Sequence, residues 1–175
     1  ASNGYAMYNY MGTSTPGVYV KNNLLIASST TAGAYAYYLN GSTYVTQQDY
    51  NDFYVASGTN FLNLNGSNYT SISSWNSATS LDANSISTDP YYVSSSDLHA
   101  ASTTVNNAGT TGTGITDDID NQLRSSTPDI GADEYTPSYD DAGILAIDSP
   151  YAGFCAGTQR VVVKLKNYSL LGSLT

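Results

Sequence analysis

An internal repeat in the first third of the chain most constrains its fold. The segment that begins at Gly4 recurs at Gly33, with GYAMY opening the first copy and GAYAYY the second. At the same spacing KNNLLIAS is followed by YNDFYVAS, so that Asn22 aligns with Asn51 and Leu24 with Phe53. A period in the twenties is typical of one coil of a β-solenoid, with three short strands and turns between them. The repeat therefore predicts stacked parallel strands rather than an antiparallel sandwich.

Each coil of a solenoid buries apolar side chains that point inward. The expected inward positions are Val18, Val20, Leu24 and Ile26 in the first copy and Tyr44, Val45, Phe53 and Val55 in the second. Asn22 and Asn51 fall at equivalent turns, where stacked asparagines hydrogen-bond as a ladder and tolerate a left-handed backbone. We expect these two asparagines to lie directly above one another as structural residues, with glycan binding as the alternative role.

The composition agrees with short strands that are half exposed to water. Charged residues make up 11% of the chain, against roughly 25% in an average soluble protein. Ser, Thr, Asn and 17 Tyr take their place, and Tyr and Thr suit a pleated surface. No apolar run approaches the roughly 18 residues that span a bilayer. The net charge of −9, with five basic residues, disfavours a nucleic acid as partner.

Residues 58–93 have the pattern of a last coil that carries an insertion. The string YTSISSWNSAT predicts one or two helical turns near residues 70–79, with Ile72 and Trp75 on one face at i, i+3. Trp75 is the only tryptophan of the chain. We expect it to be a structural lid packed on the solenoid, with a sugar-stacking platform as the alternative.

Acidic residues concentrate late in the chain, since nine of the 14 lie between Asp117 and Asp148. Two acidic clusters surround the lone Arg124 in TDDIDNQLRSSTPDIGADEY, and we expect carboxylates that cap turns and pair with this structural arginine. Oxygen ligands at this density also suit calcium, the one cofactor that the residue types suggest, although the EF-hand spacing is absent. The expected partners of Arg124 are Asp117, Asp118, Asp120, Asp129 and Asp133, and Glu134 completes the candidate calcium ligands.

This stretch resembles the end of secreted bacterial right-handed parallel β-helices, especially those of the Bacteroidota. The matching residues are Asp118-Ile119-Asp120, Arg124 and Pro128–Tyr135, with Asn121 where the pattern usually has glycine. Upstream, Asp82–Ser85, Asp89-Pro90 and Asp97-Leu98-His99 extend the resemblance. It implies an all-β chain in which residues 1–136 are the terminal coils of a right-handed parallel β-helix.

The end of the chain has a different pattern. Residues 137–148 are expected to be a linker, because proline, aspartate and glycine break any period there, with a short strand candidate in ILAID at Ile144–Asp148. Residues 149–175 resemble the opening of an immunoglobulin-like module, with Val161, Val163 and Leu165 on the apolar side of a half-buried strand. A sandwich needs about seven strands, so we expect a truncated β-sandwich belonging to a longer chain. Its apolar strand is expected to pair with another polypeptide, be shielded by a carrier or be poorly ordered.

Residues suited to catalysis or to zinc are sparse. His99 is the only histidine and Cys155 the only cysteine, which disfavours a zinc site and excludes an intrachain disulfide. No Gly-x-Ser-x-Gly motif is present. Glycoside hydrolysis needs paired carboxylates; Asp49 and Asp52 flank one turn, but no equivalent pair follows them. We expect no catalytic residue in this chain.

The sequence leaves two functions open. The first is a non-catalytic structural or adhesive segment of a large secreted bacterial surface protein. The resemblance implies that such proteins include gliding or attachment cargo of the type 9 secretion system. The alternative is the non-catalytic end of a β-helix polysaccharide lyase or glycoside hydrolase. The expected partners are a surface polysaccharide, a secretion or carrier protein and the rest of the parent chain, at the cell surface or outside the cell.

Overall fold

The structure is a computed structural model that describes residues 4–10, 17–28, 33–41, 45–56, 61–94, 96–137, 142–149 and 157–167. The chain divides into two compact units, residues 1–135 and residues 136–175. The described residues form ten strands and one helix, so this part of the chain is mostly β-structure. In this part of the chain, no helix is long and apolar enough to cross a membrane.

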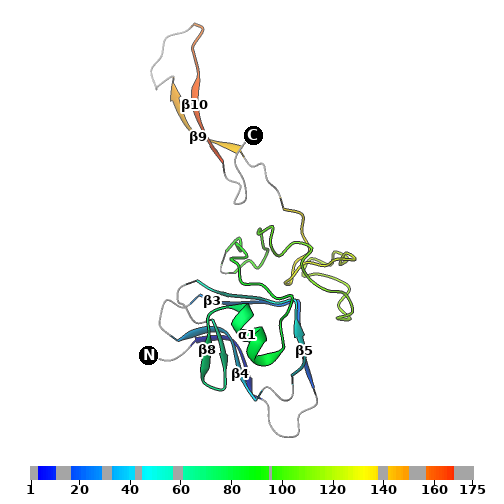
Figure 1. Ribbon diagram of the computed structural model, residues 1–175. Helices are drawn as coiled ribbons and strands as arrows, with labels where there is room; N and C mark the ends of the chain where they lie inside the picture. The colour runs from blue at the N-terminus through cyan, green and yellow to red at the C-terminus, as the bar shows by residue number, and fades with distance from the viewer. Residues whose placement is uncertain are drawn as a thin grey trace. The chain divides into compact units, whose positions relative to one another are not determined.

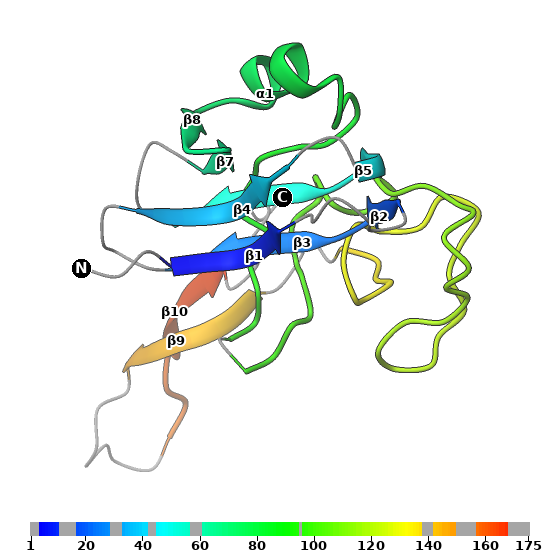
Figure 2. The same ribbon diagram turned by 90° about the horizontal axis from the view of Figure 1, so that it is seen from below.

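The repeated segments form strands that pair side by side (Figures 1 and 2). The strands of the first copy are β1 (Gly4–Tyr10), β2 (Val18–Lys21) and β3 (Leu24–Ala27). Those of the second copy are β4 (Ala34–Asn40), β5 (Val45–Asp49) and β6 (Asp52–Val55). Each strand of the first copy pairs in parallel with its counterpart: β1 with β4, β2 with β5 and β3 with β6. The predicted parallel stacking of the two copies is therefore present.

The register of the strand pairs differs from the alignment of the repeat. Phe53 in β6 pairs with Leu25 of β3 rather than with the aligned Leu24. Tyr8 in β1 pairs with Tyr38 of β4 rather than with the aligned Tyr37. A shift of one residue turns a strand's side chains to the opposite face. Leu25, rather than the predicted Leu24, therefore packs against the cluster that contains Phe53.

A third set of strands continues the stack and then carries the insertion. β7 (Leu62–Leu64) lies parallel to β4, and β8 (Ser67–Tyr69) turns back antiparallel to β7. The helix α1 (Ile72–Thr79) follows, within the range expected to be helical. Its N-cap is Ser71, whose Oγ accepts a hydrogen bond from the backbone N–H of Ser74 at 3.1 Å.

After α1 the chain returns to the stack. The backbone N–H of Asp82 donates to the carbonyl of Gln48 at 2.9 Å, and that of Ile86 donates to the carbonyl of Asn51 at 2.8 Å. Ile86 forms a parallel bridge with Asp52. Residues 82–86 thus lie along β5 and β6 as a third copy, which is longer than the first two because it contains the insertion.

The main core of the first unit consists of large apolar side chains. It contains Ala36, Tyr37, Leu39, Phe53, Leu62 and Trp75, all fully buried. Of the predicted inward residues whose side chains are described, Val20 and Phe53 are buried, and Val18, Leu24, Ile26 and Val55 are half-buried. Tyr44 and the side chain of Val45 lie outside the described residues.

The described residues between positions 87 and 135 contain no strand, which corrects the expectation of stacked strands up to residue 136. This segment consists of turns, with isolated bridges such as Asp117 to Leu123. Asn107 and Asn121 adopt positive φ angles of 54° and 64°. Asn121 thus adopts the left-handed conformation, which asparagine tolerates better than most residues. A second cluster of Ala100, Val105 and Ile130 anchors the segment against Leu24 and Ile86.

The second unit contains an antiparallel strand pair, β9 (Ala142–Ser149) with β10 (Val162–Asn167). β9 contains the short strand expected at Ile144–Asp148 within the segment 137–148, and it begins two residues before that candidate. Val161, Val163 and Leu165 are exposed rather than half-buried, because two strands alone cannot cover an apolar face. Cys155 lies outside the described residues.

Candidate functional site

The asparagine ladder forms one residue away from its predicted place. Asn51 is fully buried, and its Oδ1 accepts hydrogen bonds from the backbone N–H and from Nδ2 of Asn23, both at 3.0 Å. Asn22 instead binds the backbone of Thr110 twice: its Nδ2 donates to the carbonyl at 2.7 Å, and its Oδ1 accepts from the N–H at 2.9 Å. The prediction that Asn22 stacks on Asn51 is thus wrong, and Asn22 holds a distant turn against the strand stack.

A buried carboxylate organises the third copy of the repeat. Asp82 accepts hydrogen bonds from Trp75 Nε1 at 2.7 Å, Gln48 Nε2 at 2.5 Å, Ser85 Oγ at 2.6 Å and Asn51 Nδ2 at 3.3 Å. We call these five residues the Asp82 network. Burial raises the pKa of Asp82, and the four donors oppose that rise. The ring of Trp75 is fully buried, so it offers no face to a sugar and packs as a lid on the core.

Asp52 is a second buried carboxylate. Its two oxygens accept hydrogen bonds from the backbone N–H of Thr88 at 2.9 Å and from Thr88 Oγ1 at 3.3 Å. Burial raises the pKa of Asp52 from 3.8 to about 6, and Asp89 adds to the rise through its negative charge. The folded protein therefore binds a proton at Asp52 more tightly than the unfolded chain does.

This shift predicts the sign of a pH dependence. The free energy of unfolding should fall as the pH rises from about 4 to about 6, because ionised Asp52 is buried at a cost. Asp52→Asn removes that cost, so the variant should gain stability relative to the wild type by up to about 3 kcal/mol between pH 4 and pH 7. Urea unfolding of both proteins at the two pH values measures the difference. A difference that does not change with pH would contradict the prediction.

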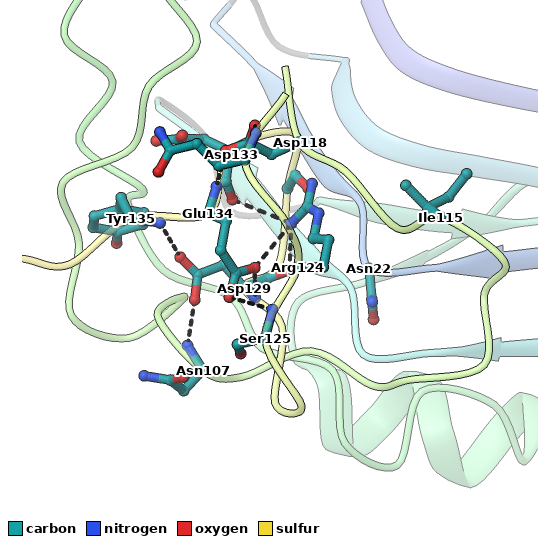
Figure 3. A network of polar contacts seen from close by, with 12 residues as sticks. Asn22, Asn107, Ile115, Asp118, Arg124, Ser125, Asp129, Asp133, Glu134 and Tyr135 are labelled. Atoms are coloured by element: carbon teal, nitrogen blue, oxygen red, sulfur yellow. Dashed lines mark hydrogen bonds and ion pairs between the residues drawn. The ribbon is translucent and has the colours of Figure 1, made fainter. Parts of the chain in front are cut away.

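Arg124 is the centre of the closing segment, by which we mean residues 117–135 (Figure 3). Its guanidinium donates to the carbonyl of Gly131 at 2.7 Å and to that of Asp133 at 3.2 Å. Its charged partner is Glu134, with Nη1 to Oε2 at 3.5 Å. The prediction of an aspartate partner is therefore wrong, since the backbone of the Asp129–Asp133 turn takes the donors that an aspartate would have taken.

The carboxylates of the closing segment are largely occupied by backbone N–H groups. Asp118 accepts from the N–H groups of Asp120, Gln122 and Glu134 at 2.8 to 3.1 Å. Asp129 accepts from Asn107 at 2.6 Å and from Tyr135 at 2.9 Å. Glu134 accepts from Ser125 at 3.1 Å and from Asp129 at 3.0 Å. These carboxylates act as turn caps, and each holds together parts of the chain that lack regular strands.

The six candidate calcium ligands do not converge on one point. Of these six, only Asp120 and Asp133 belong to a group of potential ligand atoms within 4.8 Å of one another in the described part of the chain. The third member of that group is His99, which the sequence did not indicate as a ligand.

Four tyrosines form an aromatic surface on β1 and β4, which we call the tyrosine patch: Tyr5, Tyr8, Tyr35 and Tyr38. Tyr5 stacks on Tyr35 with ring centroids 5.9 Å apart, and Tyr8 stacks on Tyr38 at 5.1 Å. Edge-to-face contacts join the two stacks, with Tyr5 to Tyr38 at 5.2 Å. On β1, Tyr5 is 39% exposed and Tyr8 is 48% exposed, whereas Tyr35 on β4 is only 9% exposed, so the exposed part of the patch is on β1.

An irregularity in β4 decides which tyrosines belong to this surface. The backbone N–H groups of both Ala36 and Tyr37 donate to the carbonyl of Phe61, at 2.9 and 3.3 Å. This break in the alternation turns Tyr37 into the core, while Tyr35 and Tyr38 contact each other edge to face with ring centroids 5.7 Å apart. Strict alternation along the sequence therefore does not predict the patch.

A cavity of about 620 Å³ lies beside the corner between β2 and β3. Lys21 and Asn23 line it from the strands, and Thr111, Ile115 and Leu123 line it from the later turns. Figure 3 shows Asn22 and Ile115 on the same side of Arg124. The lining mixes hydroxyl and apolar groups with four charged residues, Lys21, Asp117, Asp118 and Arg124.

Comparisons with protein-family models, with curated proteins and with solved structures find no match for this chain. Sequence reasoning missed two features, the tyrosine patch and the position of His99. The sequence does contain a signal for the tyrosine patch, because the pair Tyr5 and Tyr8 recurs with the same internal spacing as Tyr35 and Tyr38. The spacing Asp-x-His at His99 is a weaker signal for the second, since only the fold brings Asp120 and Asp133 to it.

Proposed function

We propose that this chain is a non-catalytic, adhesive end segment of a secreted bacterial cell-surface protein, and that its tyrosine patch binds polysaccharide. In this proposal the strand stack is the end of a right-handed parallel β-helix, and the closing segment terminates it. The resemblance of Pro128–Tyr135 to the ends of such proteins supports the cell-surface assignment, including cargo of the type 9 secretion system that serves gliding or attachment. The tyrosine patch is the observation that carries the binding function.

The pairing pattern supports the solenoid part of the proposal. Three strand positions of one copy recur in the next, and each recurs in parallel and in the same order along the chain. Trp75 and α1 cover the core where β7 and β8 end the first sheet. A covered end stops further strands from adding to the stack, as a terminal repeat must do.

The tyrosine patch has the physical character of a carbohydrate platform. A tyrosine ring offers an apolar face that packs on the C–H face of a sugar, while its hydroxyl stays available for hydrogen bonds. Large contiguous apolar patches on the surface of a protein mark binding sites, whereas single exposed apolar residues do not. The four rings contact one another and stand on paired strands, so little conformational freedom is lost when a ligand binds.

The charge of the chain indicates which polysaccharide suits this surface. The net charge of −9 repels polyanions such as alginate at low salt. We therefore expect a neutral glycan to bind and an anionic one to be excluded.

Affinity electrophoresis in gels that contain a neutral β-glucan or alginate tests this function. The wild-type chain should be retarded by the β-glucan, and the double variant Tyr5→Ala/Tyr8→Ala should lose about tenfold in affinity because two stacking faces are removed. Tyr8→Phe should bind like the wild type if the ring face is what the sugar contacts. Tyr19→Ala is the matched control, because Tyr19 is 65% exposed but belongs to β2 and not to the patch.

Circular dichroism melting of each variant separates loss of binding from loss of folding. Equal retardation of the wild type and the double variant, or equal loss in Tyr19→Ala, would rule out the tyrosine patch as the binding surface.

A further inference from the structure

His99 lies between three carboxylates that come from different parts of the first unit. Its Nδ1 is 2.5 Å from Asp97 Oδ1, and its Nε2 is 2.8 Å from Asp120 Oδ2. A ligand atom of Asp133 completes a group with His99 and Asp120 in which all three atoms lie within 4.8 Å of one another. We call these four residues the His99 cluster. It joins the turn at residues 97–99 to both halves of the closing segment.

Asp133 is the buried member of the His99 cluster. The residue is 5% exposed. The charged groups that act on it are His99, Asp118 and Asp120. Figure 3 shows Asp133 next to Asp118. A buried carboxylate beside two others needs a nearby positive charge.

The orientation of the imidazole matches what a metal ligand requires. Histidines that bind metals present one ring nitrogen to the ion and hold the other against a carboxylate, which fixes the ring. Asp97 holds Nδ1 in this way. A second hydrogen bond reinforces the geometry, since the backbone N–H of His99 donates to the same Oδ1 at 3.2 Å. Nε2 is thereby directed toward the side of Asp120 and Asp133.

We propose that His99 Nε2, Asp120 and Asp133 bind a divalent transition-metal ion of the zinc class, with Asp97 positioning the imidazole. One nitrogen and two carboxylate ligands suit Zn²⁺. Calcium takes oxygen ligands in larger number, so it is not expected to bind here. The ion joins segments 97–99, 117–121 and 132–134, which lack strands of their own, and this site is separate from the proposed glycan surface.

The single histidine makes the site directly observable. Titration of the full chain with Zn²⁺ at pH 7.5 should shift the one pair of imidazole signals in ¹H–¹³C spectra, with saturation at one equivalent. Ca²⁺ at the same concentration should leave these signals in place. No variant is needed for this measurement, so it cannot be confused by misfolding.

Calorimetric titration with Zn²⁺ then assigns the ligands. His99→Gln, Asp120→Asn and Asp133→Asn should each weaken binding by about tenfold or more. Asp120 is half-exposed, so its variant is the least prone to misfold. Asp117→Asn is the matched control, because it removes one negative charge from the same segment outside the cluster, and it should change the affinity by less than about twofold.

Three results would overturn the site. They are unchanged imidazole signals at excess Zn²⁺, an equal response to Ca²⁺, and a loss in Asp117→Asn as large as that in Asp133→Asn. The last result would mean that zinc collects on the general negative charge of the segment.

Discussion

Asp82→Ala is expected to lower the free energy of unfolding by about 4 kcal/mol, because it removes a carboxylate that accepts four hydrogen bonds in the core. The donors of Trp75, Gln48, Asn51 and Ser85 would all remain buried. Each buried donor without an acceptor costs about 1–3 kcal/mol, and relaxation of the neighbours recovers part of the sum. Urea unfolding followed by the fluorescence of Trp75, the only tryptophan, measures the effect.

Two further variants test the cause of that loss. Asp82→Asn keeps the shape of the side chain and tolerates the φ of 61° at this position, but its amide nitrogen cannot accept a hydrogen bond. Its stability should fall between those of Asp82→Ala and the wild type. Asp117→Ala removes a carboxylate without touching the network and should change stability by less than about 0.5 kcal/mol. If Asp82→Ala and Asp117→Ala unfold alike, the network does not hold the third copy in place.

The repeat predicts the parallel pairing of the first two copies but not their register. β1 and β4 are shifted by one residue in one direction relative to the aligned repeat, and β3 and β6 are shifted by one residue in the other. The offset of the aligned repeat therefore has a value between the register of β1 with β4 and the register of β3 with β6, and it fits neither pair. The error of one residue is why Asn23, rather than Asn22, stacks on Asn51.

The closing segment shows a different limit of sequence reasoning. Its acidic residues and Arg124 do form a network that holds turns together, as the composition predicts. Which carboxylate faces the guanidinium depends on how Gly131 and its neighbours turn, and the sequence pattern does not encode that geometry. Glu134 reaches Arg124, while Asp129 is held by the backbone of Asn107 and Tyr135.

The His99 cluster is the feature of the structure that is hardest to predict from the sequence. Asp97 and His99 are neighbours in the chain, but Asp120 and Asp133 follow much later, in the two halves of the closing segment. No periodic pattern connects them, because the described residues between 87 and 135 form turns whose path is set by side-chain to backbone hydrogen bonds. Hydrogen bonds from Arg124 to Gly131 and from Glu134 to Asp118 join the two halves of the closing segment, and the packing of Ile130 against Val105 fixes the second half on the core.

Arg124→Ala is expected to lower the free energy of unfolding by about 3 kcal/mol and to loosen the closing segment. The guanidinium is largely buried and serves the carbonyls of Gly131 and Asp133 together with the carboxylate of Glu134, all of which would lose their donor. Arg124→Lys should recover only part of the loss, because one ammonium group cannot match the planar array of donors.

Thermal melting in the presence and absence of EDTA decides whether this arginine or a metal ion is the main organiser of the segment. We expect Arg124→Ala to lower the melting temperature more than EDTA lowers that of the wild type, because the Arg124 side chain is 11% exposed whereas those of His99 and Asp120 are 40% and 49% exposed. Arg160→Ala, which removes an exposed arginine from the second unit, controls for the change in net charge and should leave the melting of the first unit unchanged. A larger effect of EDTA than of Arg124→Ala would reverse the order and make the metal ion the principal link between the turns.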